Sequence, residues 1–462
     1  MALAARAEGL DYLAAAQSWN LPQVSPEELE RVTRAASTPD FTLTWNLEAP
    51  KNYWRGDASR CLGHGWTVAM RARTASGRDA IADLLEMNAL DYQSEKPTVP
   101  NFESHALIHS LGGIVAYSHP CRWWRGKWGG QGHYPVEQNK FISNMAPELP
   151  FDTICGPTYD AIDIMMQPNE RIANEAALKL WFLLLDHGYH IAASGSSDAT
   201  FDNPGGGVPG RVRIYSHLDG APLNGEAGLP RIARSIQAGH SFVTSGPLLV
   251  LEIGGHTSGD LVTLPVASQK GRIRAWADRL RRVELIRNGA VVRTFEAANG
   301  KSEFVGEFGV SETERAWYIA RCYGSDDTQI AFTNPVWFEP QGWQPPAPSR
   351  AQVSVMVVDS GSGKPLAGTC EVLRMAGKEA VVDSRFRFRG GKISLDVPGT
   401  SRLRIQVPGY QPSTRSIFMD YAPVRDLTLN MRVEQLLDWG TFQKITDLLR
   451  HVDLKIRMEP AV

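Results

Sequence analysis

The spacing of apolar residues over the first 240 residues alternates between strand-like and helix-like patterns. Short apolar runs such as Phe41–Leu47 and Ile114–Ser118 predict buried strands. Longer stretches, such as Asn101–Leu111 and Asn169–His187, predict helices that end at the glycines Gly112-Gly113 and Gly188. Strands and helices in strict alternation indicate βαβ units and a largely parallel sheet. About seven strands in about 220 residues favour a barrel over an open sheet.

The pattern changes near residue 240, after which strand-like segments dominate. Arg282–Ile286 and Val291–Phe295 flank Asn288-Gly289, a dipeptide typical of a tight β-hairpin. The proline-rich stretch that follows predicts a semi-rigid linker, and Val433–Leu449 has helical spacing. We therefore expect an α/β domain over 1–240, a β-sandwich over 241–340, the linker over 341–350, a second β-sandwich over 351–432, and a C-terminal helix and tail over 433–462.

Composition excludes several classes of protein. Hydrophobic residues make up 43% and charged residues 21%, which argues against a disordered chain. The net charge is -2, so there is no basic excess of the kind that binds nucleic acid. The apolar runs fall well short of the roughly 20 residues that a membrane-spanning helix needs. The five cysteines are widely spaced, so we expect neither a disulfide framework nor a zinc ribbon.

The first residues read as the end of a helix, with Gly9 as its C-cap and a strand at Leu10–Ala15. No N-cap and no signal peptide precede them. We therefore expect a segment upstream of Met1 to be missing. The cellular compartment stays open, and a truncated N-terminus would be compatible with a secreted or periplasmic protein.

Four residues that can bind metals lie next to predicted strands, and in α/β folds ligands bind outside the carboxyl ends of strands. Two imidazoles and two carboxylates form a ligand set for zinc, manganese or iron. A metal there would acidify a bound water and polarise an ester or amide carbonyl. The four residues are Glu48 after Phe41–Leu47, His64 before Gly65–Met70, His119 after Ile114–Ser118, and Asp198 after Ile191–Ser194.

Each of these residues also has an ordinary structural explanation. A glutamate at a strand end is commonly solvated, a histidine before glycine commonly lies in a loop, and Asp198 can cap the following turn. His119, fixed by Pro120 after a buried strand, is the most informative of the four. His105 and His109, four residues apart on a predicted helix, can form a zinc pair. Because that helix precedes its strand, we expect both on the surface.

Several short motifs follow one another in an informative order. They are Ala-Glu-Gly-Leu-Asp-Tyr-Leu near the start, Gly63-His64, Tyr117-Ser118-His119-Pro120, Ser197-Asp198-Ala199-Thr200, and the segments 209–215 and 239–247. With them, about residues 1–335 resemble the PHP superfamily (polymerase and histidinol phosphatase) in its carbaryl-hydrolase-like CehA/McbA branch. The stretch Val357–Gly368 resembles a carboxypeptidase-regulatory, transthyretin-like β-sandwich.

The resemblance implies a distorted (β/α)7 barrel that binds two or three divalent metals. It implies a hydrolase in which a metal-bound hydroxide attacks a phosphoester, carbamate or amide. Carried over by position, Glu48 would be the bridging carboxylate, His64 and His119 would complete one metal site, and Asp198 would reach the other. Zinc or manganese is the expected cofactor. Thr200 stands where many superfamily members have a further ligand histidine.

The sequence departs from the family at its start. The superfamily opens with a strand that carries His-x-His, whereas this chain has no histidine before His64. The expected fold is therefore an α/β, distorted (β/α)7 PHP barrel that lacks its first strand, followed by two all-β sandwich modules and a C-terminal helix. Four protein ligands around one tetrahedral metal would leave no position for water, which argues against efficient hydrolysis by this chain.

The sequence gives few clues to the substrate. Arg122, Trp123 and Trp124 follow His119 and would line the mouth of the site, where arginine suits a carboxylate or phosphate and tryptophan suits a flat or sugar-like face. An equal alternative is a surface loop anchored by its tryptophans. We therefore expect a small-molecule or glycan-like substrate and leave oligomerisation open. The competing hypotheses are a non-catalytic, degenerate PHP-fold protein that binds a glycan or protein partner, and a structural module.

Overall fold

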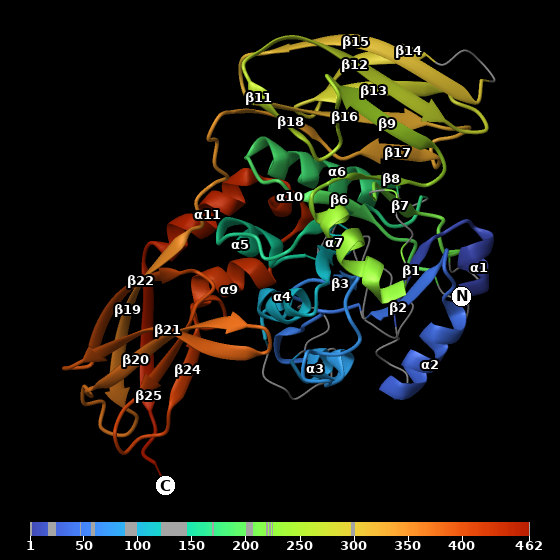
Figure 1. The fold of residues 1–462 in the computed structure, drawn as a ribbon. Helices are drawn as coiled ribbons and strands as arrows, with labels where there is room; N and C mark the ends of the chain where they lie inside the picture. The colour runs from blue at the N-terminus through green and yellow to red at the C-terminus, as the bar shows by residue number, and fades with distance from the viewer. Residues whose placement is uncertain are drawn as a thin grey trace, which may run out of the picture.

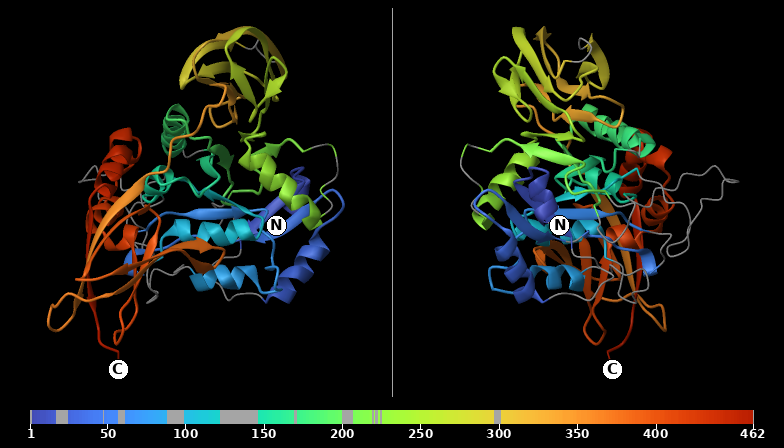
Figure 2. Two further views of the ribbon diagram at one scale, coloured as in Figure 1. Left: turned by 60° about the vertical axis from the view of Figure 1, so that its left-hand side comes forward. Right: turned by 90° about the vertical axis from the view of Figure 1, so that its right-hand side faces the viewer.

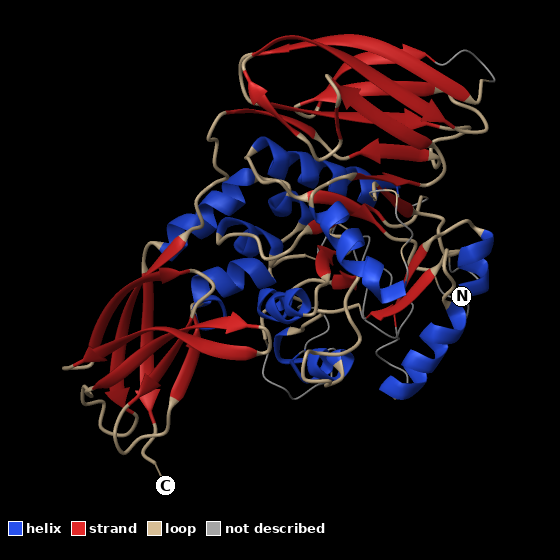
Figure 3. Ribbon diagram, viewed as in Figure 1, coloured by secondary structure: helices blue, strands red, loops and turns tan. Residues whose placement is uncertain are grey.

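The computed structural model describes residues 2–16, 25–46, 48–56, 61–87, 99–121, 146–168, 171–199, 207–218, 220, 223, 225–296 and 301–461 (Figure 1). Helices gather in the central region, and two β-rich parts project from different sides of it (Figures 2 and 3). Among the described residues, strand residues outnumber helical residues. No helix in these ranges is both long enough and apolar enough to cross a membrane.

The central region contains two small sheets. Strands β1 and β2 form a parallel pair, and the four-stranded sheet has the order β3-β4-β5-β6. The strands are β1 (Tyr12–Ala16), β2 (Thr42–Asn46), β3 (Gly65–Val68), β4 (Ile114–Tyr117), β5 (Ala161–Met165) and β6 (Ala192–Gly195). The helices are α1 (Ala2–Ala7), α2 (Pro26–Ala36), α3 (Ala80–Met87), α4 (Asn101–Ser110), α5 (Leu149–Ile154), α6 (Arg171–Asp186) and α7 (Leu229–Gln237).

The prediction of a (β/α)7 barrel is wrong. In the described part of the chain the sheets do not close, because no strand ladder joins β2 to β3 or β6 to β7. The next strand, β7 (Arg213–Ser216), pairs with β8 (Ser241–Thr244) and so belongs to the β-rich part that follows. The prediction of a largely parallel sheet holds only for β4, β5 and β6, since β3 runs antiparallel to β4.

The middle β-rich part consists of two facing sheets around their own apolar core. One sheet has the order β10-β9-β12-β15, and the other runs β11-β18-β16-β17-β8-β7 with β13 and β14 attached through β16. Alternate residues of β9 are buried, as expected for a strand with one face on the core. The strands are β9 (Leu248–Ile253), β10 (His256–Thr257), β11 (Leu261–Leu264), β12 (Val266–Trp276), β13 (Arg282–Arg287), β14 (Ala290–Glu296), β15 (Glu303–Glu312), β16 (Ala316–Tyr323), β17 (Ile330–Thr333) and β18 (Val336–Pro340).

The hairpin predicted at Asn288-Gly289 is confirmed, since β13 and β14 pair across it. Asn288 has a φ of 45° and Gly289 a φ of 76°. Two consecutive positive φ angles are what a tight hairpin turn requires, which is why asparagine and glycine stand there.

The C-terminal part contains two further sheets, β22-β19-β25 and β21-β20-β23-β24. Its last strand was not predicted, because 433–462 was expected to be a helix and tail. The elements are β19 (Arg350–Asp359), β20 (Gly368–Ala376), β21 (Glu379–Phe388), β22 (Lys392–Pro398), β23 (Arg402–Gln406), β24 (Ser413–Ser416), α8 (Ile417–Asp420), α9 (Ala422–Leu429), α10 (Val433–Leu436), α11 (Trp439–Leu449) and β25 (Val452–Met458).

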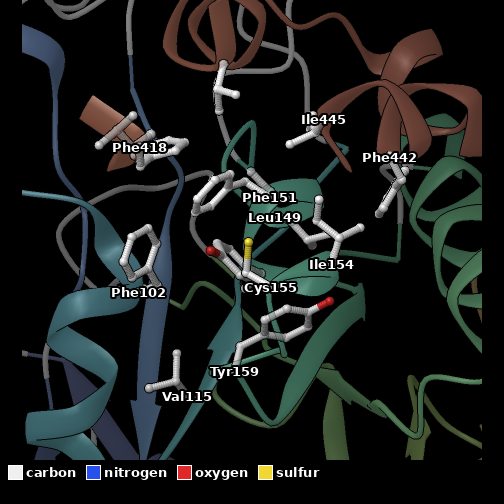
Figure 4. Close-up of a cluster of buried hydrophobic side chains, with 14 of the residues drawn as sticks. Phe102, Val115, Leu149, Phe151, Ile154, Cys155, Tyr159, Phe418, Phe442 and Ile445 are labelled. Carbon is white, nitrogen blue, oxygen red and sulfur yellow. The ribbon is translucent and has the colours of Figure 1, made fainter. Parts of the chain in front are cut away.

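A shared apolar core joins the C-terminal part to the central region (Figure 4). Phe418 of α8 lies with its ring centroid 4.5 Å from Phe151 of α5 and 5.8 Å from Phe102 of α4. Phe442 and Ile445 of α11 are fully buried in the same cluster. The buried aromatic rings of both parts therefore hold the helices of the central region in place.

The proline-rich segment 341–350 lies against the central region. The ring of Trp343 stacks on His190 with a centroid separation of 5.0 Å, and the Ser349 N–H donates to the Ile154 carbonyl at 2.6 Å. The segment therefore contacts the central region through both a ring stack and a backbone hydrogen bond.

Candidate metal centre

Three of the four predicted ligands meet at one point. Glu48, His64 and His119 each offer a ligand atom, and these atoms all lie within 4.8 Å of one another. The Glu48 Oε1 atom is 3.0 Å from His64 Nδ1 and 3.6 Å from His119 Nε2. The two imidazole rings are 5.1 Å apart and meet edge to face at 72°. Two imidazoles and a carboxylate are the ligand set of many catalytic zinc sites.

The antiparallel pairing of β3 with β4 explains how the two histidines meet. Gly65 is paired with Tyr117, so the residue before β3 and the residues after β4 share one edge of the sheet. The Ser118 N–H donates to the His64 carbonyl at 2.8 Å, which extends the ladder by one step. In a wholly parallel sheet, a residue that precedes its strand would have lain at the opposite edge.

Close packing of Pro50 on Gly65 brings Glu48 to the same place. The Gly65 N–H donates to the Pro50 carbonyl at 2.7 Å. A Cβ atom on residue 65 would lie 2.8 Å from Pro50 Cδ, closer than side chains tolerate. Because residue 65 has no side chain, the segment after β2 can lie directly against the start of β3.

The two histidines carry buried nitrogens that lack hydrogen bonds. Within the described residues they are Nε2 of His64, Nδ1 of His119, and Nδ1 of His64, which lies 3.0 Å from Glu48 Oε1 without the geometry of a hydrogen bond. Both side chains are almost fully buried. Buried polar atoms are normally hydrogen-bonded, so unsatisfied ring nitrogens that face a carboxylate indicate a place for a further group. Together with the ligand types, these atoms fit a divalent cation.

The electrostatics favour the protonation states that bind metals. Burial raises the pKa of Glu48, but the charge interaction with His64, the positive charge of Lys51 and the side-chain contacts with His119 and His64 outweigh it and hold that pKa well below its usual value. Burial, followed by the charge of Lys51, lowers the pKa of His64 to about 3. The glutamate is therefore ionised and His64 is neutral near neutral pH, as metal ligation requires.

Asp198, the fourth predicted ligand, lies outside this group of ligand atoms. It is exposed, and it lines the same cavity as Glu48 and His119. Asp198 has a φ of 43° and His119 a φ of 33°. Both therefore adopt the left-handed conformation that is costly for residues other than glycine, and such strain tends to occur at functional sites.

The cavity beside this centre has a volume of about 660 Å³. Apolar and aromatic side chains, including Trp45, Trp66 and Ile232, form much of its wall. That size and lining are typical of a pocket for a small molecule.

Two residues near the centre escaped the sequence prediction. Lys51 is buried, and its Nζ atom donates to Glu48 Oε2 at 2.7 Å. Asp163 is buried on β5 and accepts hydrogen bonds from Ser194 and Ser196, and burial raises its pKa. A single acidic residue within the apolar strand Ala161–Met165 was a signal that could have identified Asp163.

The expectation that His105 and His109 lie on the surface is wrong for His105. His105 is completely buried, and its Nδ1 atom lies 2.7 Å from Thr158 Oγ1 and 3.6 Å from Asp152 Oδ2. His109 is partly exposed and contacts Asp160 at 2.8 Å. The two histidines thus bond to different partners. The predicted substrate residues Arg122, Trp123 and Trp124 lie outside the described residues.

No family model and no curated protein matches this chain. Among solved structures it is similar to BcpA, the major pilin subunit of Bacillus cereus, with 12% identity, 47% of this chain and 72% of that chain covered, and a TM-score of 0.16. It is also similar to the CARDB domain of PF1109 from Pyrococcus furiosus, with 18% identity, 20% and 96% covered, and a TM-score of 0.15. Scores this low carry no argument about the fold or function of this chain.

Proposed function

We propose that this protein is a metal-dependent hydrolase whose metal is held by Glu48, His64 and His119. The observation that carries the proposal is the meeting of these ligand atoms within 4.8 Å, with three buried histidine nitrogens that lack hydrogen bonds. The PHP-like motifs in the sequence include His64 and His119 and support the same reading. Zinc is the first expectation, because two histidines and a glutamate are a common catalytic zinc set, and manganese is the second.

A divalent ion bound there would supply Lewis acidity toward a phosphoryl or carbonyl oxygen and would make water a better nucleophile. Glu48 contributes the negative charge of the site, and Lys51 holds one of its oxygens in a fixed direction. With three protein ligands rather than four, a metal held here would keep a coordination position for water or substrate. Phosphoesters, carbamates and amides are the substrate classes to test.

The experiment measures metal content and turnover on the same samples. The full chain is loaded with zinc or manganese, dialysed and analysed by mass spectrometry for bound metal. Hydrolysis is then followed with p-nitrophenyl phosphate, a naphthyl carbamate and a peptidyl p-nitroanilide. We expect one metal per chain and measurable turnover of at least one substrate. His119→Ala and Glu48→Gln should lose both.

His451→Ala is the matched control, because His451 is an exposed histidine far along the chain in the C-terminal part. It should retain the metal and the activity of the unsubstituted chain. If His119→Ala and Glu48→Gln also retain both, the proposal is wrong.

One observation favours the alternative of a non-catalytic binding protein. The Lys51 ammonium group already lies 2.7 Å from Glu48 and neutralises part of the charge that a cation would meet. In that case the chain would bind zinc weakly, and Lys51→Met would strengthen zinc binding without creating turnover. Calorimetric titration with zinc, together with turnover assays on the unsubstituted chain and on Lys51→Met, separates the two functions.

A further inference from the structure

Charge is unevenly distributed along this chain, and its basic residues gather in the last sandwich. The whole chain has a net charge of -2. Residues 350–416, which make up most of the C-terminal part (Figure 1), contain 11 basic and 5 acidic side chains. The rest of the chain is therefore acidic overall. A local basic excess of this kind favours a negatively charged partner.

One face of the sheet β21-β20-β23-β24 presents three arginines to solvent. Glu371 of β20 is paired with Arg385 of β21 and with Arg404 of β23. Residues paired across antiparallel strands point to the same face. The neighbours Cys370 and Val372 are buried in the core, so Glu371 and its partners point outward. We name this surface the arginine face, and its residues are Thr369, Glu371, Arg385, Arg387, Arg404, Gln406 and Thr414.

Glu371 orients two of these arginines and leaves part of each guanidinium available. The Arg385 Nε atom donates to Glu371 Oε1 at 2.7 Å, and the Arg404 Nε atom donates to Glu371 Oε2 at 2.6 Å. The Nη2 atoms contact the same carboxylate. Among the described residues, the Nη1 groups of both arginines have no hydrogen-bond partner. Two donor groups in fixed positions are therefore open to a ligand.

Arg387 adds a third cation, which has no ion pair in the described part of the chain. It is exposed and follows Arg385 by two residues on β21, about 7 Å further along the strand. Arg404 belongs to a strand about 10 Å away from β21, because β20 lies between them. The face thus sets three positive charges against one carboxylate. A linear chain with a negative group on each unit can meet all three cations at once.

The residue types of the arginine face distinguish between classes of polyanion. None of the residues named for this face is apolar or aromatic. A protein partner would need an apolar centre to its interface, and single-stranded nucleic acid would stack its bases on aromatic rings. A membrane surface would call for apolar side chains that enter it. Thr369, Gln406 and Thr414 instead offer hydroxyl and amide groups, which suit the hydroxyls of a sugar.

We propose that the arginine face binds an acidic polysaccharide, a linear chain whose sugar units carry carboxylates. The guanidinium fork matches the geometry of a carboxylate, so Arg385, Arg387 and Arg404 pair with acidic groups along the polymer. The threonines and Gln406 bond to sugar hydroxyls between these groups. No residue of the arginine face belongs to the candidate metal centre, so this inference stands apart from the proposed hydrolase.

The test uses polygalacturonate, a polysaccharide with one carboxylate on each unit. Its control is the fully methyl-esterified polymer, which keeps the backbone and removes the charge. Binding of the full chain to each immobilised polymer is measured by interferometry at about 0.15 M salt. We expect polygalacturonate to bind about tenfold more tightly than the ester. Its binding should weaken as salt is added.

Two variants test the face itself. Arg387→Gln removes an exposed positive charge, and Gln406→Glu adds a carboxylate on β23, two strands from Arg387. Each should weaken binding of polygalacturonate about fivefold. Arg350→Gln is the matched control, because it changes the net charge by the same amount on β19, in the other sheet of the sandwich. It should bind like the unsubstituted chain.

Folding of the variants is checked by urea denaturation. Both substituted side chains of the arginine face are exposed, so the free energy of unfolding should not change. If one variant is unstable, the other still tests the face. Equal binding of polygalacturonate and its ester would overturn the proposal, and so would equal weakening by Arg350→Gln.

Three other polyanions test the class of ligand. They are single-stranded DNA, polyglutamate and vesicles that contain an anionic phospholipid. Weaker binding of all three than of polygalacturonate supports the proposal. Binding of any one of them as tightly as polygalacturonate would overturn the assignment to a polysaccharide.

Discussion

Two carboxylates of this chain have different surroundings, and the contrast separates candidate function from structure. Glu371 in the C-terminal part has a side chain that is 1% exposed, and Arg385 and Arg404 both donate to it, at 2.7 Å and 2.6 Å from their Nε atoms. Glu48 instead lies between two histidines, of which three buried nitrogens have no hydrogen bond. The first carboxylate has all the partners it needs, whereas the second group is incomplete by itself.

The difference matters because an unsatisfied buried polar group costs stability. A site that keeps such groups in the absence of a ligand is less stable than a fully bonded cluster of the same size. Ligand binding offsets that cost. Substitutions at a fully bonded carboxylate should therefore lower the free energy of unfolding. Replacing a ligand at the candidate metal centre should raise it when no metal is bound.

The largest effect is expected at Glu103, which resembles Glu371 in being buried and paired. Glu103 of α4 is almost fully buried and binds Arg402 of β23 through both oxygens, so it joins the central region to the C-terminal part. Breaking a buried pair leaves one charge without a partner, so Glu103→Ala should lower the free energy of unfolding by about 3 kcal/mol. Urea denaturation measures this. Glu103→Gln, which keeps the shape and one acceptor, should lose less, and equal losses would contradict the charge argument.

A pH-dependent effect is expected at Asp152, which is buried near His105. Burial raises its pKa from 3.8 to about 7, so folding favours the protonated carboxyl group. That stability is fully present below pH 3.8 and is lost as the pH rises through 7. Asp152→Asn cannot ionise, so its cost relative to the unsubstituted chain should shrink between pH 5 and pH 8, by on the order of 1 kcal/mol or more.

The Asp152 prediction is checked by measuring the free energy of unfolding of the unsubstituted chain and of Asp152→Asn at several pH values. His105 titrates in the opposite direction, since burial holds its pKa well below 6.5, but it is present in both chains. The difference between the chains therefore reports on Asp152 together with its charge interaction with His109. A cost of Asp152→Asn that grows with pH would contradict the raised pKa of this carboxyl group.

At the candidate metal centre, replacing a ligand should stabilise the metal-free chain. His64→Leu removes two buried nitrogens that lack hydrogen bonds, and in the presence of EDTA it should raise the free energy of unfolding by about 1 kcal/mol. Zinc should raise the Tm of the unsubstituted chain and leave that of the variant unchanged. If the metal-free variant is less stable than the unsubstituted chain, the nitrogens were not a source of instability.

The smallest effect is expected at Glu371. Its arginine partners have side chains 64% and 35% exposed, so they regain water readily when the carboxylate is removed. Glu371→Gln should cost less than about 1 kcal/mol. A loss as large as that of Glu103→Gln would show that exposure of the partner does not control the cost.

The sequence predicted the positions of helices and strands better than it predicted which strands pair and in which direction. Ile114–Ser118 and Asn101–Leu111 correspond closely to β4 and α4, because the length of a segment and the glycines that end it act on the local backbone. The direction of β3 and the edge position of β7 depend on distant partners, and no local pattern encodes them. The strand β25 was missed for a similar reason, since it exists through its pairing with β19, about a hundred residues earlier.

The site residues also divide into those that a local pattern identified and those that depend on the fold. The rule that ligands lie next to strand ends identified Glu48, His64 and His119. For His64 the rule succeeded only because β3 is antiparallel. The same rule selected Asp198, which lies in the cavity wall away from the other ligand atoms. Lys51 gave no signal, because its role depends on a fold that buries it beside Glu48.

The pairing of β25 with β19 also determines how the C-terminal part responds to mechanical force. The two strands are parallel and in register from Val353 with Val452 to Asp359 with Met458. Tension applied between the segment before β19 and the segment after β25 would pull the strands past each other along their length. All hydrogen bonds of that ladder would then bear load at the same time, rather than opening one after another. This part of the chain should therefore resist extension in that direction more strongly than a hairpin pulled apart from its open end.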